Sequence, residues 1–130
     1  MYTGQCLCGG IRFEIDSELA PIQICYCKQC QRAQGTVFAT NAPVAVSAFR
    51  LTRGSELIRS YESSPGKERC FCGVCGSPLY SKRESLPDVL RIRVGLLDGE
   101  LATQPVAHFH TRSKPNWWRI NDDLPQHAEG

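Results

Sequence analysis

The sequence of 130 residues lacks any long apolar run, and it lacks an excess of charge of one sign. No stretch is long and apolar enough to span a bilayer, so a membrane-spanning protein is not expected. Fifteen Lys and Arg residues oppose thirteen Asp and Glu residues, and the two signs are interleaved along the chain. Because no basic stripe forms, a nucleic-acid partner is not expected either.

The first residues also lack the features of a secretion signal. Met1 to Cys6 contain neither a basic start nor an apolar stretch followed by a small-residue cleavage site. We therefore expect a cytoplasmic protein, in which cysteines stay reduced. The chain has 42% hydrophobic residues and shows no repeat or linker, so residues 1–130 are expected to form a single domain.

Against these absences, eight cysteines in a short chain are the most informative feature. They fall into three tight clusters, and in a chain without a secretion signal such clusters indicate metal binding rather than a disulfide framework. The three clusters are Cys6 and Cys8; Cys25, Cys27 and Cys30; and Cys70, Cys72 and Cys75.

The first and third clusters each contain a bidentate half-site followed by glycine. Cys72 to Gly76 have the C-x-x-C-G form of a turn that wraps one edge of a tetrahedral metal, and Cys6 to Gly10 offer a second half-site. Together these halves supply the four thiolates of a closed structural zinc site. Spacing alone leaves open a competing arrangement, in which Cys6 and Cys8 join two cysteines of the middle cluster.

The middle cluster places three thiolates on six residues and leaves a fourth metal position free, which is the pattern of catalytic zinc sites. Alternatively, Cys70 or a histidine completes this site and makes it structural. Cys70 could be a fourth ligand, a second nucleophile or a buried small residue. His108 and His110 stand at strand spacing, so both imidazoles are expected to face one side, and hydrogen bonding is favoured over metal ligation for them.

Alternation of apolar and polar residues predicts a mainly β protein. In the run Val89 to Val94, the alternation sets Arg91 and Arg93 between apolar neighbours. One short helix is expected from Lys28 to Gln34, ended by Gly35, and the residues from about Gln126 on are expected to fray. The expected strands cover residues 11–16, 22–24, 36–42, 57–61, 78–81, 89–94 and 106–111.

Several ordered motifs resemble the glutathione-dependent formaldehyde-activating enzyme family. They are the first cysteine motif from Gly4 to Phe13, the middle motif from Cys25 to Gly35, the C-x-x-C-G-S-P motif from Phe71 to Pro78, and the late segment from Asp122 to Gln126. The resemblance covers nearly the whole chain. The chain departs from the family pattern at Tyr26 and Gln31, where the family often has His and Arg.

The resemblance implies a mainly β fold, a β-tent of antiparallel sheets with zinc-binding cysteine knuckles and two zinc ions per chain. It implies a carbon–sulfur lyase that acts on a thiol–aldehyde adduct such as S-(hydroxymethyl)glutathione, with a glutathione-like thiol and formaldehyde as partners. The implied structural zinc ligands are Cys6, Cys8, Cys72 and Cys75. The implied catalytic zinc ligands are Cys25, Cys27 and Cys30.

An open zinc position suits this chemistry, because it binds a thiol as thiolate at neutral pH beside an incoming carbonyl carbon. Three thiolate ligands make zinc a poor Lewis acid, so capture and orientation of the thiol are favoured over carbonyl polarisation. The candidate cations for the carboxylates of such a substrate are Lys28, Arg32, Arg112 and Lys114. The alternative function is a non-enzymatic, zinc-stabilised binding or chaperone-like module; no oligomeric state is predicted.

Overall fold

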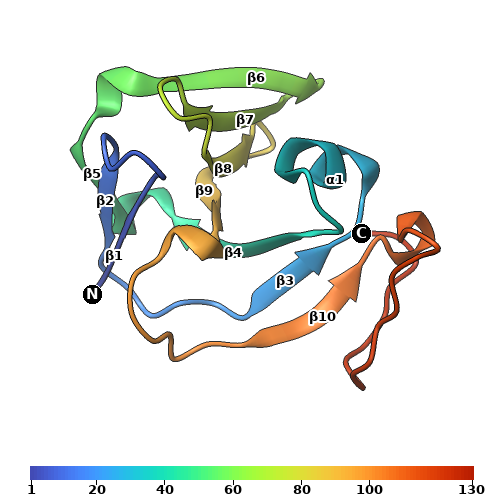
Figure 1. Cartoon of the computed structure of the whole chain (residues 1–130). Helices are drawn as coiled ribbons and strands as arrows, with labels where there is room; N and C mark the ends of the chain where they lie inside the picture. The colour runs from blue at the N-terminus through green and yellow to red at the C-terminus, as the bar shows by residue number, and fades with distance from the viewer.

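The computed structural model describes residues 1–130 and has ten strands in two sheets (Figure 1). The smaller sheet has the strand order β1-β2-β5, and the larger sheet has the order β10-β3-β4-β9-β8-β7-β6. Neighbouring strands are antiparallel except β10 and β3, which run parallel. The strands are β1 Tyr2–Gln5, β2 Arg12–Ile15, β3 Ile22–Cys25, β4 Ala39–Ala45, β5 Phe49–Arg53, β6 Ile58–Ser64, β7 Lys67–Cys72, β8 Pro78–Arg83, β9 Leu86–Arg93 and β10 Pro105–Phe109.

The two sheets enclose the main apolar core, which confirms the predicted β-tent architecture. Phe13 and Ile15 of β2 pack against Val44 of β4 and against Leu90 and Ile92 of β9, and all five side chains are buried. Burial of each such side chain stabilises the fold by about 1.5–3 kcal/mol. Because strand side chains alternate between faces, this packing leaves the intervening residues of β9 on the opposite face of the larger sheet.

The one α-helix, α1, spans Lys28–Gln34 and confirms the predicted helix. The Cys27 Sγ accepts a hydrogen bond from the Cys30 backbone N–H at 3.3 Å and so caps the N-terminus of α1. Gly35 ends the helix in the left-handed region at φ 68°, a conformation that favours glycine. No helix of this fold is both long and apolar enough to cross a membrane. Four short 3-10 turns lie at Val46–Ala48, Ser55–Leu57, Val94–Leu96 and Thr111–Ser113.

Three strands were not predicted. The short strands β1 and β5 flank β2 in the smaller sheet and owe their pairing to this neighbour rather than to a long alternating pattern of their own. Strand β7 includes Cys70 and Cys72 of the third cysteine cluster, and this segment was interpreted as a metal-binding motif rather than as a strand. The strand expected from residue 36 begins only at Ala39.

The C-terminal residues do not fray, contrary to expectation. The backbone of His127 donates to the carbonyl of His108 at 2.8 Å and accepts from the N–H of Thr111 at 3.0 Å. The ring of His127 also stacks on Phe109 with centroids 5.0 Å apart. The terminal segment therefore returns alongside the end of β10, as Figure 1 shows in red.

Candidate metal centres

The structure brings the first and third cysteine clusters together rather than the first and the middle. The Sγ atoms of Cys6, Cys8, Cys72 and Cys75 all lie within 4.8 Å of one another. The Cys6 and Cys8 sulfurs are 3.5 Å apart, and the Cys8 and Cys72 sulfurs are 3.9 Å apart. A tetrahedral zinc with bonds of ~2.3 Å separates its thiolates by ~3.8 Å, so this group fits such an ion. We refer to these four residues as the four-cysteine group.

Two members of the four-cysteine group lie in an apolar surrounding, whereas Cys8 is exposed and Cys75 is partly buried. Cys6 and Cys72 are buried with Ile11 and Leu79. The backbone N–H of Ile11 donates to the Cys6 Sγ at 3.3 Å, and hydrogen bonding with Ser77 lowers the pKa of the Cys75 thiol to about 5. Donors of this kind favour the thiolate form, which is the form that binds metal.

The middle cluster forms a second group at the junction of β3 and α1. Cys25 ends β3, Cys27 caps α1 and Cys30 lies in the first turn of α1. Their Sγ atoms lie within 4.8 Å of one another, and no other Cys, His, Asp or Glu side chain belongs to the group. We refer to these three residues as the three-cysteine group. Three ligands with one free position match the donor set of an open zinc site.

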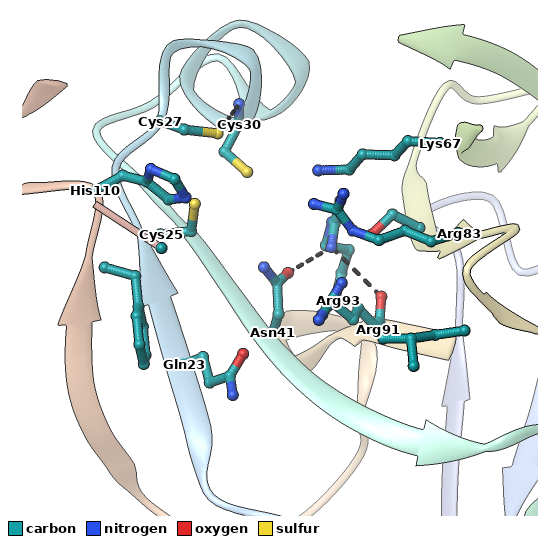
Figure 2. A pocket seen from close by; sticks show the side chains of 14 residues that line it. Gln23, Cys25, Cys27, Cys30, Asn41, Lys67, Arg83, Arg91, Arg93 and His110 are labelled. Carbon is teal, nitrogen blue, oxygen red and sulfur yellow. Dashed lines mark hydrogen bonds between the residues drawn. The ribbon is translucent and has the colours of Figure 1, made fainter. Parts of the chain in front are cut away.

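The three-cysteine group opens onto a cavity of about 450 Å³ that is lined mostly by residues of the larger sheet (Figure 2). Arginine and lysine side chains line the opposite wall, and no Asp or Glu side chain lines the cavity. The four cations are Lys67 of β7, Arg83 of β8, and Arg91 and Arg93 of β9. We call these four residues the cationic wall.

The strand register explains how the cationic wall forms. Arg91 and Arg93 occupy alternate positions of β9, on the face opposite the core residues Leu90 and Ile92. Asn41 pairs with Arg93 across the sheet, and its side chain accepts a hydrogen bond from the Arg93 guanidinium. The alternation noted in the sequence was thus a signal for this wall, although the sequence did not show that the arginines face the cysteines.

The cationic wall contains partly buried positive charges that no carboxylate of the chain neutralises. Burial lowers the pKa of Lys67, Arg91 and Arg93, and the nearby Arg69 lowers the pKa of Lys67 and Arg93 further. None of the four wall residues forms an ion pair with a carboxylate, and the buried Nε of Arg93 has no hydrogen-bond partner. Such a surface attracts an anionic ligand.

The thiols of the three-cysteine group share charge unequally. Hydrogen bonds from Cys25 and Cys27 hold the pKa of the Cys30 thiol far below its ordinary value, and the Arg69 guanidinium lowers it further. Hydrogen bonding to Cys27 and Cys30 raises the pKa of the Cys25 thiol. These contacts therefore favour the thiolate form at Cys30 over that at Cys25.

The cations expected from the sequence, Lys28, Arg32, Arg112 and Lys114, do not line the cavity, so that expectation was wrong. Lys28 and Arg32 lie on the exposed side of α1, because nearness in sequence to a cysteine does not decide which side of a helix a residue occupies. Arg112 pairs with Glu129 at 2.9 Å, and the Lys114 ammonium donates to the carbonyls of Pro115 and Trp118.

The two histidines do not face one side, contrary to expectation. His108 is buried, with its Nδ1 2.9 Å from the Tyr26 hydroxyl and its Nε2 3.0 Å from the Asp122 carboxylate. His110 instead lines the cavity beside the cysteines (Figure 2). Strand β10 ends at Phe109, and His110 adopts the left-handed region at φ 58°, which turns its side chain away from the strand pattern.

Cys70 belongs to neither thiol group. It is buried, and burial raises the pKa of its thiol as well as that of the neighbouring Tyr80, which rises to about 12. A protonated, enclosed thiol is a weak nucleophile, so among the three alternatives this geometry favours a buried small residue.

The two departures from the family pattern have structural partners. The Gln31 side chain donates to the carbonyls of Tyr26 and Ser113, both at 2.8 Å. The bond from Gln31 to Ser113 and the contacts of His108 with Tyr26 and Asp122 tie the segment that carries the three-cysteine group to the C-terminal segment. Tyr26 and Gln31 therefore brace the site from the side away from the cavity.

Comparisons with known proteins agree with the motifs. A family model described as glutathione-dependent formaldehyde-activating enzyme matches residues 1–113. A Halomonas elongata protein, provisionally named as an enzyme of that kind, is 30% identical over 129 residues, which cover 92% of this chain and 81% of the relative. An uncharacterized lyase of Schizosaccharomyces pombe is 31% identical over 81 residues, covering 61% of this chain and 56% of the relative.

A solved structure of a Rhodobacter sphaeroides protein has the same fold. It superposes with a TM-score of 0.64 and 27% identity, and the match covers 80% of this chain and 99% of the other.

Proposed function

The chain belongs to the glutathione-dependent formaldehyde-activating enzyme family, and from this premise we propose that it is a zinc-dependent carbon–sulfur lyase. The proposed substrate is the S-hydroxymethyl adduct of an anionic, glutathione-like thiol. Cys25, Cys27 and Cys30 would hold the catalytic zinc. Cys6, Cys8, Cys72 and Cys75 would hold a structural zinc, giving two ions per chain.

One observation carries the proposal: three clustered thiols face a cationic wall across one cavity. Zinc held by these thiols would bind the substrate sulfur as thiolate in its remaining position. The cavity then needs only to orient an aldehyde against that sulfur, and orientation alone can contribute several kcal/mol to a barrier reduction.

The cationic wall accounts for an anionic thiol. Lys67, Arg83 and Arg91 reach the cavity without a carboxylate partner from the chain, so the carboxylates of the substrate can fill that role. These residues take the place of Lys28 and Arg32 as the expected anion-binding groups.

The reaction requires one proton transfer. In synthesis, the sulfur lone pair forms a bond to the carbonyl carbon, the carbonyl π electrons move to oxygen, and that oxygen takes up a proton. In the lyase direction, the hydroxyl loses its proton and the carbon–sulfur bond breaks, leaving the electron pair on sulfur. His110 is the one imidazole that lines the cavity, and we assign it the transfer of this proton.

The test must separate catalysis from spontaneous exchange, because thiols and formaldehyde form adducts unaided. Exchange spectroscopy by NMR should show faster interconversion of S-(hydroxymethyl)glutathione and glutathione with wild type than with Cys27→Ser or with buffer. Metal analysis of the same samples should find two zinc ions in wild type and one in Cys27→Ser. If wild type matches buffer for glutathione and for a second anionic thiol, the lyase assignment fails and the binding-module alternative replaces it.

A further inference from the structure

Arg69 of β7 is a buried arginine without a carboxylate partner. Only 8% of its surface is exposed, and no Asp or Glu forms an ion pair with it. A buried charge is strongly destabilising unless an opposite charge or hydrogen bonds compensate it. The groups in contact with Arg69 should therefore include those that compensate its positive charge.

The guanidinium of Arg69 lies against the sulfur of Cys30. Its Nη1 and Nη2 are 3.8 Å and 3.7 Å from the Cys30 Sγ. Its Nε donates to the Ser63 Oγ at 3.1 Å, and its Nη2 also contacts the Gln29 Oε1 at 3.4 Å. Ser63 and Gln29 are neutral, so the Cys30 sulfur, which is a thiolate when it binds a metal, is the one group in contact with this cation that can carry a negative charge.

This contact makes the three thiols of the three-cysteine group unequal. Cys30 receives a cationic, two-pronged contact, whereas Cys27 receives the backbone N–H of Cys30 at 3.3 Å. No side chain donates a comparable bond to Cys25. N–H donors withdraw electron density from a thiolate sulfur and so weaken it as a nucleophile.

The difference matters for a site that handles an aldehyde. A ligand thiolate is itself a nucleophile: its lone pair can form a bond to the carbonyl carbon while the oxygen takes a proton, which would convert the ligand into a thioether. Three thiolates also place one net negative charge on a zinc centre, and an adjacent guanidinium offsets that charge.

We propose that Arg69 is a positioning residue that holds Cys30 as the least nucleophilic ligand thiolate of the site, and so protects this ligand from addition to the aldehyde. This inference rests on the metal site of the proposed function. It adds a residue that touches neither metal nor substrate and acts through Cys30.

The test compares Arg69→Met, which keeps the length of the stem without the charge, with Arg69→Lys, which keeps the charge without the fork. Zinc-loaded protein is labelled with limiting iodoacetamide, and each cysteine is quantified by peptide mass spectrometry. In Arg69→Met, labelling of Cys30 relative to Cys25 should rise about tenfold, because a charge-assisted hydrogen bond is lost. Arg69→Lys should give an intermediate rise.

A spectroscopic signature provides a second readout. With cobalt in place of zinc, the spectrum of wild type minus that of Cys27→Ser isolates the sulfur-to-cobalt charge-transfer band of the three-cysteine group. In Arg69→Met this band should move to longer wavelength, since the Cys30 sulfur becomes a stronger donor. Arg32→Met removes an exposed cation of α1 that has no sulfur contact, so it should change neither the band nor the labelling order.

The outcomes separate the two hypotheses. If wild type shows no such cobalt band, the metal site of the proposed function is wrong. If the band is present, and folded Arg69→Met shows the labelling order and band of wild type, the role of Arg69 is overturned. Circular dichroism reports folding, and if Arg69→Met does not fold, the same two measurements on Arg69→Lys decide the question.

Discussion

The two thiol groups use the same ligand type in opposite settings. The four-cysteine group joins distant segments of the chain, since Cys8 and Cys72 are 64 positions apart in sequence. Its buried members lie among apolar side chains such as Ile11 and Leu79. The three-cysteine group draws all its sulfurs from residues 25–30 and faces a cavity with a cationic wall. One group links distant parts of the chain, while the other presents its sulfurs to a cavity.

The comparison indicates that the side chains around a cysteine sulfur, more than the number of cysteines in its group, distinguish the two sites. Apolar packing and backbone donors enclose Cys6 and Cys72. Around Cys30, by contrast, the donor is a buried guanidinium, and cations without carboxylate partners stand across the cavity. Charges that the fold leaves unpaired are available for a ligand, and at the three-cysteine group these charges line the same cavity as the sulfurs.

Loss of a ligand from the four-cysteine group should have the largest effect. Cys72→Ser removes a fully buried sulfur that ties β7 to the N-terminal segment. Metal binding at such a site is folding free energy, so we expect the loss of several of the ~5–15 kcal/mol that stabilise a typical domain. Thermal unfolding followed by circular dichroism should show a protein that is unfolded or melts far below wild type. A melting curve like that of wild type would show that this group is not structural.

The matched change in the three-cysteine group should leave the fold intact. Cys27→Ser removes one metal ligand, but serine is a favourable N-cap residue and keeps the acceptor that Cys27 supplies to α1. We expect a change of about 1 kcal/mol or less in the free energy of unfolding, together with loss of one zinc and of adduct exchange. Urea unfolding and metal analysis measure these effects. If Cys27→Ser destabilises as much as Cys72→Ser, the contrast between the two groups is wrong.

The features that were predicted correctly from the sequence are those that depend on the spacing of nearby residues. Half-site spacing and strand alternation identified the two kinds of thiol cluster, the short helix and most strands of the larger sheet. The position of Gly35 after the last polar residues of the helix was enough to end α1 correctly. The pairing of the first cluster with the third was one of two open alternatives, since spacing carries no information about which distant half-sites meet.

The sequence did not predict what depends on the curvature of the larger sheet. Lys67, Arg83 and Arg91 come from three strands and meet only because those strands are adjacent and antiparallel. His110 leaves the strand pattern because of a single left-handed residue. Arg69 reaches Cys30 across 39 positions of sequence, and no periodicity signals such a contact.

The cationic wall offers a smaller, more specific test of the open site. Arg91→Gln should raise the KM for S-(hydroxymethyl)glutathione about fivefold, since a partly exposed ion pair contributes ~1 kcal/mol. The adduct of 2-mercaptoethanol, which has no carboxylate, should lose little. Arg32→Gln, on the exposed side of α1, is the matched control and should behave like wild type with both adducts. Equal losses with the charged and uncharged adducts would mean that Arg91 shapes the cavity without binding the anion.

The smallest expected effect concerns the brace behind the three-cysteine group. The hydrogen bond with His108 holds the pKa of the Asp122 carboxyl below its ordinary value, so the folded state favours the carboxylate. A depressed carboxyl pKa stabilises the fold above the unfolded value of about 3.9, and this contribution is lost as the pH falls through the folded pKa. Asp122→Asn should therefore melt slightly below wild type at pH 7, and the two proteins should converge at acid pH.

Asp123→Asn is the matched control for this last comparison, because Asp123 is exposed and accepts no hydrogen bond from a side chain. Melting curves from pH 7 to pH 3 should show a difference from wild type that shrinks with acid for Asp122→Asn and stays near zero for Asp123→Asn. Because Asp122 reaches the cysteines only through His108 and Tyr26, zinc should dissociate faster from the three-cysteine group and at an unchanged rate from the four-cysteine group. Faster release from both groups would show that Asp122 supports the fold as a whole, and the brace would then not distinguish the open site from the closed one.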